Sequence, residues 1–234
     1  MEFLNNTAVL LAAGSGSRLS GALADKVLWN LAGKPVVRWS ADAFAAAGVV
    51  ERIIVTYRDG AQLSRLEHLL AGLSLPLTYV RGGAQRHDSV RLALENPGEN
   101  SALTFIHDAA RPLIHPDTLR ALLETARRTG NAVLAHRVAD TIREAPAADV
   151  PERTALREPP RERLWAMETP QVFPTEAIRR AYRALDSPVT DDAAAAQRAG
   201  MPLTLVENPR PNPKLTRPAD IPWLEYLAAR IGAA

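Results

Sequence analysis

Near its amino end the chain reads Ala8-Val9-Leu10-Leu11-Ala12-Ala13-Gly14-Ser15-Gly16-Ser17-Arg18-Leu19. An apolar run meets a glycine-rich turn, and an arginine follows directly. This order predicts a buried strand whose end presents backbone N–H groups and a fixed positive charge. Such a place suits a bound phosphate. We therefore expect the chain to handle a nucleotide.

Composition sets limits on the class of protein. The chain has 234 residues, of which 47% are hydrophobic and 23% charged. These values are ordinary for a soluble protein, and the length suits one α/β domain spanning residues 1–234. Basic and acidic residues nearly balance, 28 against 26, and no cluster of lysine and arginine is interleaved with aromatic residues. We therefore expect no nucleic-acid partner.

The lack of cysteine and of targeting or membrane segments excludes several kinds of site and location. The chain contains no cysteine, which excludes disulfides, thiolate metal sites and cysteine nucleophiles. The first residues lack the pattern of a signal peptide, and no uncharged apolar run is long enough to span a bilayer. We expect a cytoplasmic protein that makes no membrane contact.

Short apolar runs alternate with longer helical patterns along the chain. We predict strands at 8–12, 52–56, 77–80, 103–106 and 132–135. Helices are predicted at 35–47, 61–70, 89–94, 116–128, 175–185, 191–199 and 218–230. This alternation is typical of a doubly wound, mostly parallel sheet of the Rossmann-like α/β class. In such sheets the ligand lies beyond the carboxyl ends of the strands.

One segment interrupts the alternation. Residues 138–163 are polar, proline-rich and weakly periodic, and their prolines exclude a central strand or a long helix. A long irregular insertion in a compact domain is usually functional or disordered. We interpret 138–163 as an arm that extends from the sheet.

The glycine-rich turn is by itself a weak signal. It lacks the Gly-Lys-Ser/Thr of a P-loop, and Leu19 stands where a dinucleotide fingerprint has its third glycine. A tight strand–helix turn explains the glycines equally well. Arg18 favours a phosphate ligand, and Lys26 on the same loop can join Arg18 in clamping a triphosphate. For Lys26 alone, an ordinary surface lysine is an equal alternative.

A second motif reads Gly82-Gly83-Ala84-Gln85-Arg86-His87-Asp88-Ser89. Two adjacent glycines allow close approach of the backbone to a base or ribose. Asp88 or Ser89 can cap the helix that follows, and we favour capping for Asp88. Arg86 lies near the helix start, where it can make a second phosphate contact.

A third motif reads Ile106-His107-Asp108-Ala109-Ala110-Arg111-Pro112. An apolar strand ends in Asp108 at the mouth of the predicted sheet, where an acid can meet Mg²⁺ or a ligand hydroxyl. A loop acid or helix cap is the alternative. We interpret His107 as structural and Arg111 as the partner of an acid that holds the loop. The segment from Trp165 to Phe173 is interpreted as core and loop packing.

Two later motifs complete the set. Val189-Thr190-Asp191-Asp192 has the pattern of a helix N-cap, in which Thr190 can also touch a ligand. The segment Asn212-Pro213-Lys214-Leu215-Thr216-Arg217-Pro218 presents Lys214 from a rigid loop. In their order the motifs resemble those of the 2-C-methyl-D-erythritol 4-phosphate cytidylyltransferase family across nearly the whole chain. The matching segments are 11–19, 82–90, 107–112, 140–141, 169–171, 190–191 and 214–218.

The resemblance implies a reaction and a role for each matching residue. The phosphate of methylerythritol phosphate would attack the α-phosphorus of CTP, and pyrophosphate would leave. The resemblance makes Arg18 and Lys26 catalytic. It assigns the nucleotide to Ala12, Ala13, Gly14, Gly83, Arg86, Ser89 and Asp108, and the polyol phosphate to Thr141, Arg161, Thr190 and Lys214, with Asp108 also near this substrate. It further implies Mg²⁺, held mostly by the triphosphate, with Asp108 as the candidate protein ligand.

The resemblance also implies a homodimer whose subunits exchange the arm, so that Arg161 reaches the partner's site. Arg157 and Arg163 are alternatives for this role. The sequence departs from the family pattern at Asp25, which stands where the family usually has proline and can draw Lys26 away from phosphate. It departs again at Ala84, where an acid is common.

Other functions were weighed against this one. Ribitol 5-phosphate cytidylyltransferase is similar in fold and loops, and the Ala109-Ala110 pair favours methylerythritol phosphate. A nicotinamide-dependent dehydrogenase would need the third glycine and an acid after the second strand, where this chain has Thr56-Tyr57-Arg58. A non-catalytic nucleotide sensor would keep the glycine loop, but it has no need for Arg18, Lys26, Asp108 and Lys214 to converge.

Overall fold

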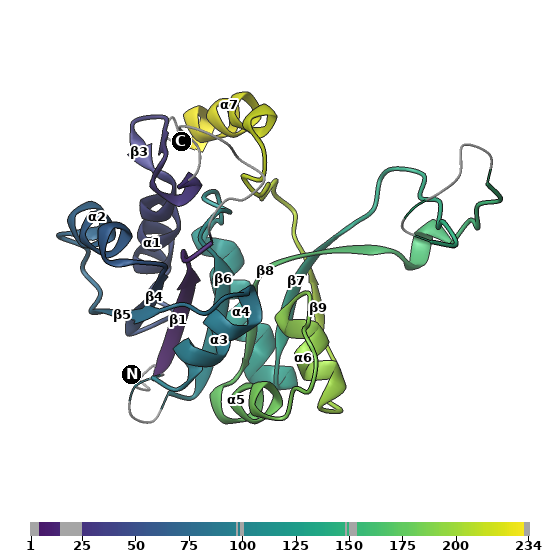
Figure 1. The fold of residues 1–234 in the computed structure, drawn as a ribbon, viewed down its shortest axis with the longest axis horizontal. Helices are drawn as coiled ribbons and strands as arrows, with labels where there is room; N and C mark the ends of the chain where they lie inside the picture. The colour runs from purple at the N-terminus through teal and green to yellow at the C-terminus, as the bar shows by residue number, and fades with distance from the viewer. Residues whose placement is uncertain are drawn as a thin grey trace.

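The computed structural model describes residues 5–14, 25–96, 98, 101–147, 149 and 154–231. Within these residues a seven-stranded sheet has the order β5-β4-β1-β6-β8-β7-β9 (Figure 1). The strands are β1 (Asn6–Leu11), β4 (Arg52–Tyr57), β5 (Leu77–Arg81), β6 (Leu103–Asp108), β7 (Ala132–Arg137), β8 (Trp165–Pro174) and β9 (Leu205–Glu207). All neighbouring pairs are parallel except those that β8 makes with β6 and β7. The predicted mostly parallel sheet is confirmed.

Helices cover both faces of the sheet. They are α1 (Val36–Ala47), α2 (Gly60–Leu70), α3 (Arg86–Leu94), α4 (Pro116–Thr129), α5 (Thr175–Arg183), α6 (Asp192–Arg198) and α7 (Ile221–Ile231). One buried cluster joins α1, α2 and α4 to one face through residues such as Phe44, Leu66 and Leu119. A second cluster joins α3, α5 and α6 to the other face around Phe173 and Ile178. The sheet is therefore buried on both sides, as its apolar strands require.

Helix boundaries follow from local chemistry. Helix α1 ends at Gly48, whose φ of 64° lies in the left-handed region that favours glycine. Helix α3 begins at Arg86, three residues before the predicted start, because the Asp88 carboxylate accepts a hydrogen bond from the backbone N–H of Gln85. The capping role expected of Asp88 is confirmed, and Arg86 lies in the first turn of the helix.

The core packing predicted for the segment from Trp165 to Phe173 is confirmed at the buried residues 168–173, but the predicted loop is wrong, because the segment forms strand β8. Proline normally excludes a central strand, so the sequence does not indicate one here. The register explains the exception: Gln171 pairs with Val133, but Met167 pairs with Ala135, so β8 carries extra residues at this point. Pro170 lies in that irregularity and interrupts no regular ladder. The short strand β9 was also missed.

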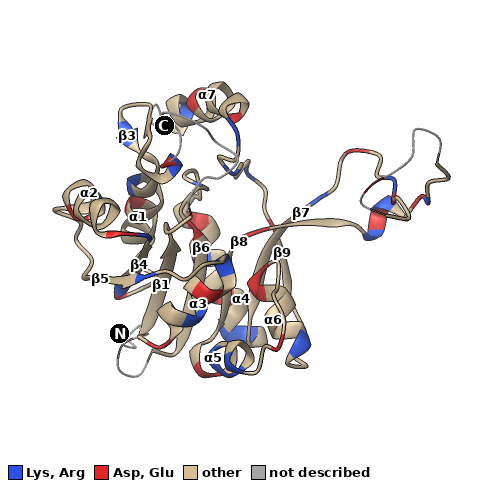
Figure 2. Cartoon of the chain, viewed as in Figure 1, with Lys and Arg blue, Asp and Glu red and all other residues tan. Residues whose placement is uncertain are grey.

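The segment between β7 and β8 extends far from the sheet (Figure 1). It contains a bridge between Glu144 and Arg157 and the short 3-10 helix η3 (Arg161–Arg163). At its base the Arg137 guanidinium lies 4.2 Å from the centre of the Trp165 ring. Basic and acidic residues follow one another along this segment (Figure 2). We keep the name arm for the segment 138–163.

The strand order places a switch point between β1 and β6. From β1 the chain moves outward through β4 to β5, and then returns to the other side of β1 as β6. Leu11 at the end of β1 pairs with Thr56 of β4 and with Asp108 of β6. Three strand ends thus lie side by side at the edge where doubly wound sheets bind ligands.

Candidate active site

A cleft of about 820 Å³ opens at this edge of the sheet. Its lining comes from the ends of β1, β4 and β6, from the loop before α3 and from two short segments distant in sequence. The lining residues are Leu11, Ala13, Gly14, Lys26, Val27, Thr56, Arg58, Gly83, Ala84, Gln85, Arg86, Ser89, Asp108, Ala110, Lys214 and Thr216. The three motifs singled out from the sequence therefore meet in one cavity, which is large enough for a nucleotide.

Asp108 is the acid that lines this cleft within the described residues. Its Oδ1 atom lies 3.0 Å from Nε of Arg86, and its Oδ2 atom lies 2.5 Å from Nζ of Lys214. Burial alone would raise the pKa of this carboxyl, but the charges of Arg86 and Lys214 outweigh burial and hold the pKa well below its usual range. Asp108 is therefore ionised at every physiological pH and fixes two cations at the cleft wall.

Arg86 has a second acidic partner that the sequence did not reveal. Its Nη1 and Nη2 atoms donate to the two carboxylate oxygens of Asp192 at 3.0 and 2.8 Å. Asp192 is fully buried and also accepts from the Tyr182 hydroxyl at 2.5 Å. Burial opposes the charge on Arg86, but Asp192 and Asp108 outweigh it and raise the Arg86 pKa. The guanidinium is thus locked between α6 and β6.

His107 supports Asp108 from beneath the cleft. The ring is fully buried, and burial lowers its pKa to about 4. Nε2 lies 3.0 Å from the Arg111 carbonyl, which can only accept, so Nε2 carries the proton and Nδ1 accepts from the Thr169 hydroxyl at 3.1 Å. The same hydroxyl accepts the backbone N–H of Asp108 at 3.0 Å. This geometry supports the structural interpretation of His107.

The side chain of Arg111 contacts backbone carbonyls and not the predicted acid. It was expected to pair with an acid, but its Nη1 donates to the Asn212 carbonyl at 2.7 Å and its Nη2 to the Met167 carbonyl at 3.5 Å. Burial lowers its pKa. Arg111 therefore ties the loop after β6 to the loop before Lys214 through backbone contacts, because the neighbouring acids are engaged elsewhere.

The glycine pair before α3 is required by crowding inside the protein. A Cβ atom on Gly82 would lie 2.5 Å from Cβ of Ala13, and one on Gly83 would lie 2.3 Å from Cβ of Asp88. Ser89 Oγ accepts the backbone N–H of Gly83 at 3.1 Å and donates to the Gln85 carbonyl at 3.2 Å. The loop thus lies directly against the end of β1, with its backbone facing the cleft.

Lys26 begins the 3-10 helix η2 (Lys26–Leu28) and lines the cleft. Its neighbour Asp25 accepts hydrogen bonds from two Arg58 nitrogens at 3.2 and 2.9 Å and from Nε2 of Gln62 at 2.7 Å. Both carboxylate oxygens of Asp25 are therefore engaged, by Gln62 of α2 and by Arg58. Arg18, the other residue expected to be catalytic, lies outside the described residues.

Comparisons with known proteins decide the family. The profile of the family described as 2-C-methyl-D-erythritol 4-phosphate cytidylyltransferase (IspD) matches residues 6–229. The chain belongs to this family. A curated member from Dehalococcoides mccartyi is 34% identical over 229 residues, covering 96% of this chain and 97% of that protein. One from Symbiobacterium thermophilum is 33% identical, covering 94% of this chain and 91% of that protein.

Solved structures agree with this assignment. The crystal structure of 2-C-methyl-D-erythritol 4-phosphate cytidylyltransferase from Thermus thermophilus matches with a TM-score of 0.76 and 30% identity, covering 96% of this chain and 99% of that chain. The structure of 4-diphosphocytidyl-2C-methyl-D-erythritol synthase from Anaerococcus prevotii gives a TM-score of 0.81 at 21% identity, covering 97% and 100%. The latter shows the shared fold.

Most of the residues that the family resemblance assigned to ligands line the cleft, and four of them do not. Those that line it are Ala13, Gly14, Lys26, Gly83, Arg86, Ser89, Asp108 and Lys214. Ala12 is buried beneath it and donates its N–H to Thr56 Oγ1 at 3.0 Å. Thr190 is exposed just before Asp191, whose side chain caps α6. Thr141 and Arg161 are exposed on the arm and do not line this chain's own cleft.

Several lining residues of this cytidylyltransferase-family cleft were missed by the motif search. Thr56 is near the end of β4 and Arg58 follows that strand, while Thr216 stands in the 214–218 motif without an assigned role. Thr56 and Arg58 could have been predicted from their place at the carboxyl end of the second parallel strand, because the fold puts that end beside the glycine-rich turn.

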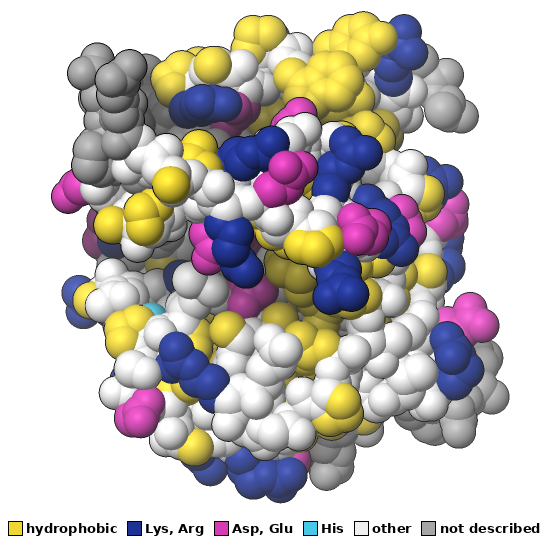
Figure 3. All heavy atoms as spheres, turned by 90° about the vertical axis from the view of Figure 1, so that its right-hand side faces the viewer, with side chains coloured by type: hydrophobic (Ala, Val, Ile, Leu, Met, Phe, Trp, Pro, Cys, Tyr) yellow, Lys and Arg dark blue, Asp and Glu magenta, His cyan; other side chains and the backbone are white. Residues whose placement is uncertain are grey.

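The described residues hold no group of three or more His, Asp or Glu side chains able to bind a metal. None of the described helices has the length and apolar character needed to cross a bilayer. On the face shown in Figure 3, basic and acidic side chains are interspersed.

Because the described residues offer no cluster of metal ligands, a divalent cation in this cleft would need most of its ligands from elsewhere, such as phosphate oxygens.

Proposed function

We propose that this chain transfers a cytidylyl group from CTP to 2-C-methyl-D-erythritol 4-phosphate. The observation that carries the proposal is Asp108 at the switch point of the sheet, bracketed by Arg86 and Lys214 in a cleft that Lys26 also lines. Membership of the family and the curated relatives support the choice of substrates.

In this reaction a phosphate oxygen of the polyol phosphate forms a bond to the α-phosphorus of CTP. The bond from that phosphorus to the bridging oxygen breaks, and pyrophosphate leaves with the bond's electron pair. The protein has little covalent work to do, so positioning and charge neutralisation dominate. Lys26 and Arg18 would neutralise charge at the α-phosphate, while the backbone at Gly14 and Gly83 would face the nucleotide.

The remaining assignments belong to the same proposal. Ala12, Ala13, Arg86 and Ser89 would shape the nucleotide site, and Lys214 and Thr190 would hold the polyol phosphate. Asp108 would position Lys214 and Arg86 between the two substrates. The reaction would take place in the cytoplasm, where CTP is made and consumed.

The proposed metal is Mg²⁺, arriving with the triphosphate. One nearby carboxylate, Asp108, together with phosphate oxygens is a donor set that suits this ion. When bound, the ion would neutralise charge on the phosphates. Because both Asp108 oxygens accept from cations, phosphate oxygens would supply most of its ligands.

The proposed assembly is a homodimer in which the arm reaches the partner's cleft. The exposed positions of Thr141 and Arg161, away from this chain's own cleft, favour this arrangement. A complementation experiment tests it. Mixed subunits carrying Lys26→Ala and Arg161→Ala would regain activity, because one site of the mixed dimer keeps both residues; absence of recovery after subunit exchange would count against Arg161.

The function itself is tested by turnover. The purified protein is incubated with CTP, Mg²⁺ and either methylerythritol phosphate or ribitol 5-phosphate, and pyrophosphate release is followed. We expect release with methylerythritol phosphate, and much slower release in Lys26→Ala as the control. Preference for ribitol 5-phosphate would favour the related polyol enzyme, and CTP binding without pyrophosphate release would favour a nucleotide sensor.

A further inference from the structure

One buried side chain contacts both Ala12, which follows β1, and Asp25, which precedes η2. Gln62, in the first turn of α2, is 1% exposed. Its Nε2 donates to the Ala12 carbonyl at 3.1 Å and to Oδ1 of Asp25 at 2.7 Å. One amide group therefore fixes the distance between Ala12 and Asp25.

The orientation of that amide is itself determined. Oε1 of Gln62 accepts the backbone N–H of Arg58 at 2.7 Å, and the Gln62 backbone N–H donates to Oδ1 of Asp59, the N-cap of α2, at 2.8 Å. The Ala12 carbonyl and the Asp25 carboxylate can only accept, and the Arg58 N–H can only donate. A flipped amide would lose all three contacts.

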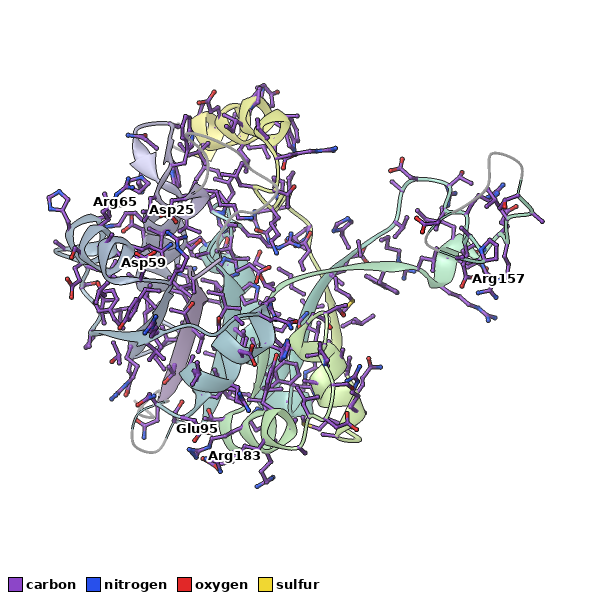
Figure 4. All side chains as sticks on the ribbon, viewed as in Figure 1. Asp25, Asp59, Arg65, Glu95, Arg157 and Arg183 are labelled. Carbon is purple, nitrogen blue, oxygen red and sulfur yellow. The ribbon has the colours of Figure 1, made fainter. Side chains whose placement is uncertain are left out.

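Arg58 fixes the same carboxylate from a second side. Its Nη1 and Nη2 atoms lie 3.2 and 2.9 Å from the two oxygens of Asp25, a bidentate pair, and its Nε donates to Asp59 at 2.9 Å. Such a pair fixes direction as well as distance. The side chains are partly buried, 35% exposed for Arg58 and 21% for Asp25. Arg58 thus links Asp25 and Asp59, which are both labelled in the region of α1 and α2 in Figure 4.

Asp25 is the residue before Lys26, and its carbonyl accepts the N–H of Leu28 at 2.9 Å to close the turn that carries Lys26. Fixing Asp25 therefore fixes the backbone from which the Lys26 side chain enters the cleft. We propose that Gln62, Arg58 and Asp25 form a positioning unit for Lys26. This inference rests on the proposed function, in which Lys26 acts at the α-phosphate.

The unit predicts a specific kinetic pattern. Asp25→Ala, Arg58→Ala and Gln62→Leu each lower kcat by roughly tenfold to a hundredfold, the scale for a catalytic group displaced by about 1 Å. KM for CTP changes by less than about threefold, because the charges that bind ground-state nucleotide remain. Asp25→Asn keeps an acceptor for Gln62 and retains more activity than Asp25→Ala.

A double-variant comparison separates positioning from a direct role. In a Lys26→Met background, Asp25→Ala causes no further loss of kcat, because the unit acts through Lys26. A further loss as large as that in the wild-type background would overturn the proposal. So would wild-type kcat in Asp25→Ala, or a rise in KM for CTP with unchanged kcat in Arg58→Ala, which would make Arg58 a direct ligand of the nucleotide.

The matched control is Glu95→Ala. Glu95 forms a bidentate pair with Arg183 at the opposite end of the molecule (Figure 4). We expect wild-type kcat in this variant, although it loses an ion pair of the same type. General destabilisation would therefore not imitate the effect at Asp25.

Hydrogen exchange decides the inference independently of turnover. We expect amides of residues 25–29 to exchange at least tenfold faster in Asp25→Ala and Gln62→Leu than in the wild type or in Glu95→Ala. Unchanged exchange there overturns the positioning unit, even if the protein turns over as proposed. If the wild type shows no cytidylyl transfer, the proposed function fails, while faster exchange at 25–29 still supports the unit.

Discussion

Asp108 and Lys214 lie 106 positions apart in the chain, yet Nζ of Lys214 lies 2.5 Å from Oδ2 of Asp108. Arg86 contacts the other oxygen of the same carboxylate at 3.0 Å. The carboxylate of Asp108 thus holds two cations at the cleft wall, and each of its two oxygens contacts one of them. A phosphate entering the cleft meets both cations at fixed positions, so little ordering remains to be done when it binds.

The first prediction concerns Lys214. We expect Lys214→Ala to raise KM for methylerythritol phosphate by roughly tenfold or more, the scale for losing a charge-assisted hydrogen bond. KM for CTP should change much less, because the glycine loops remain. Steady-state kinetics with each substrate varied in turn measures both values.

The control for Lys214 is Arg210→Ala, which removes a nearby exposed cation that pairs with Asp117 away from the cleft. We expect kinetics like those of the wild type. Equal rises of KM for both substrates in Lys214→Ala would contradict the assignment of Lys214 to the polyol phosphate.

The second prediction concerns Asp108. Asp108→Asn leaves Lys214 without its ionised partner and Arg86 with one acid in place of two, so unfolding free energy should fall by about 3 kcal/mol. Urea denaturation at pH 7 measures the change. Asp186→Asn, at an exposed acid, should stay within about 0.5 kcal/mol of the wild type.

The same variant has a pH signature. Because Arg86 and Lys214 outweigh burial and lower the Asp108 pKa, the carboxylate stabilises the fold above its unfolded pKa of about 3.9 and loses this effect as pH falls further. Wild type should therefore lose stability more steeply than Asp108→Asn below about pH 4. Parallel acid-denaturation curves would show that the ion pairs do not set the Asp108 pKa.

The parallel part of the fold could be predicted because its strands are continuous apolar runs. β1, β4, β5, β6 and β7 each differ from the predicted range by one or two residues at one or both ends. Strand β8 could not be predicted, because Pro170 is acceptable only where the register with β7 shifts, and that shift is a property of the assembled sheet.

The candidate site could be predicted in part, for a similar reason. Gly83, Arg86 and Asp108 stand in short motifs at strand ends, so a local pattern indicates them. The partners of those residues carry no local pattern. Asp192 is read from the sequence as part of a helix cap, and only the tertiary fold, in which α5 packs against both α3 and α6, brings it to Arg86.

The third prediction concerns His107, whose pKa burial lowers to about 4. The unfolded chain takes up a proton near pH 6.5, but the folded protein does so only near pH 4, so stability should fall between these values by about 3 kcal/mol. His107→Gln should remove that part of the slope. Urea denaturation at several pH values measures it.

Exposed His68 supplies the control for this slope. His68→Gln replaces a histidine at an exposed position, and its denaturation curves are compared with those of His107→Gln at the same pH values. An identical slope in wild type and His107→Gln would show that the buried ring does not govern it. The carboxylates contribute equally to both proteins, so the difference isolates His107.

The fourth prediction concerns Gly82, whose backbone lies against the end of β1. An added Cβ would lie 2.5 Å from Cβ of Ala13 and 2.7 Å from Oγ of Ser89, so Gly82→Ala must push the loop away from β1. We expect a loss of about 1–3 kcal/mol in unfolding free energy, the range for overpacking a tight contact. CTP affinity, measured by calorimetry, should fall with it, because Ala13 and Ser89 line the cleft.

Two further variants separate crowding from the loss of glycine itself. Gly60→Ala changes a glycine whose added Cβ would meet no atom of the described residues within 4 Å, so its affinity for CTP should match that of the wild type. Adding Ala13→Gly to Gly82→Ala removes the closest contact and should restore part of the lost affinity. If the double variant binds CTP no better than Gly82→Ala, contact with Ala13 is not the cause, and the close approach of these two loops does not shape the nucleotide site.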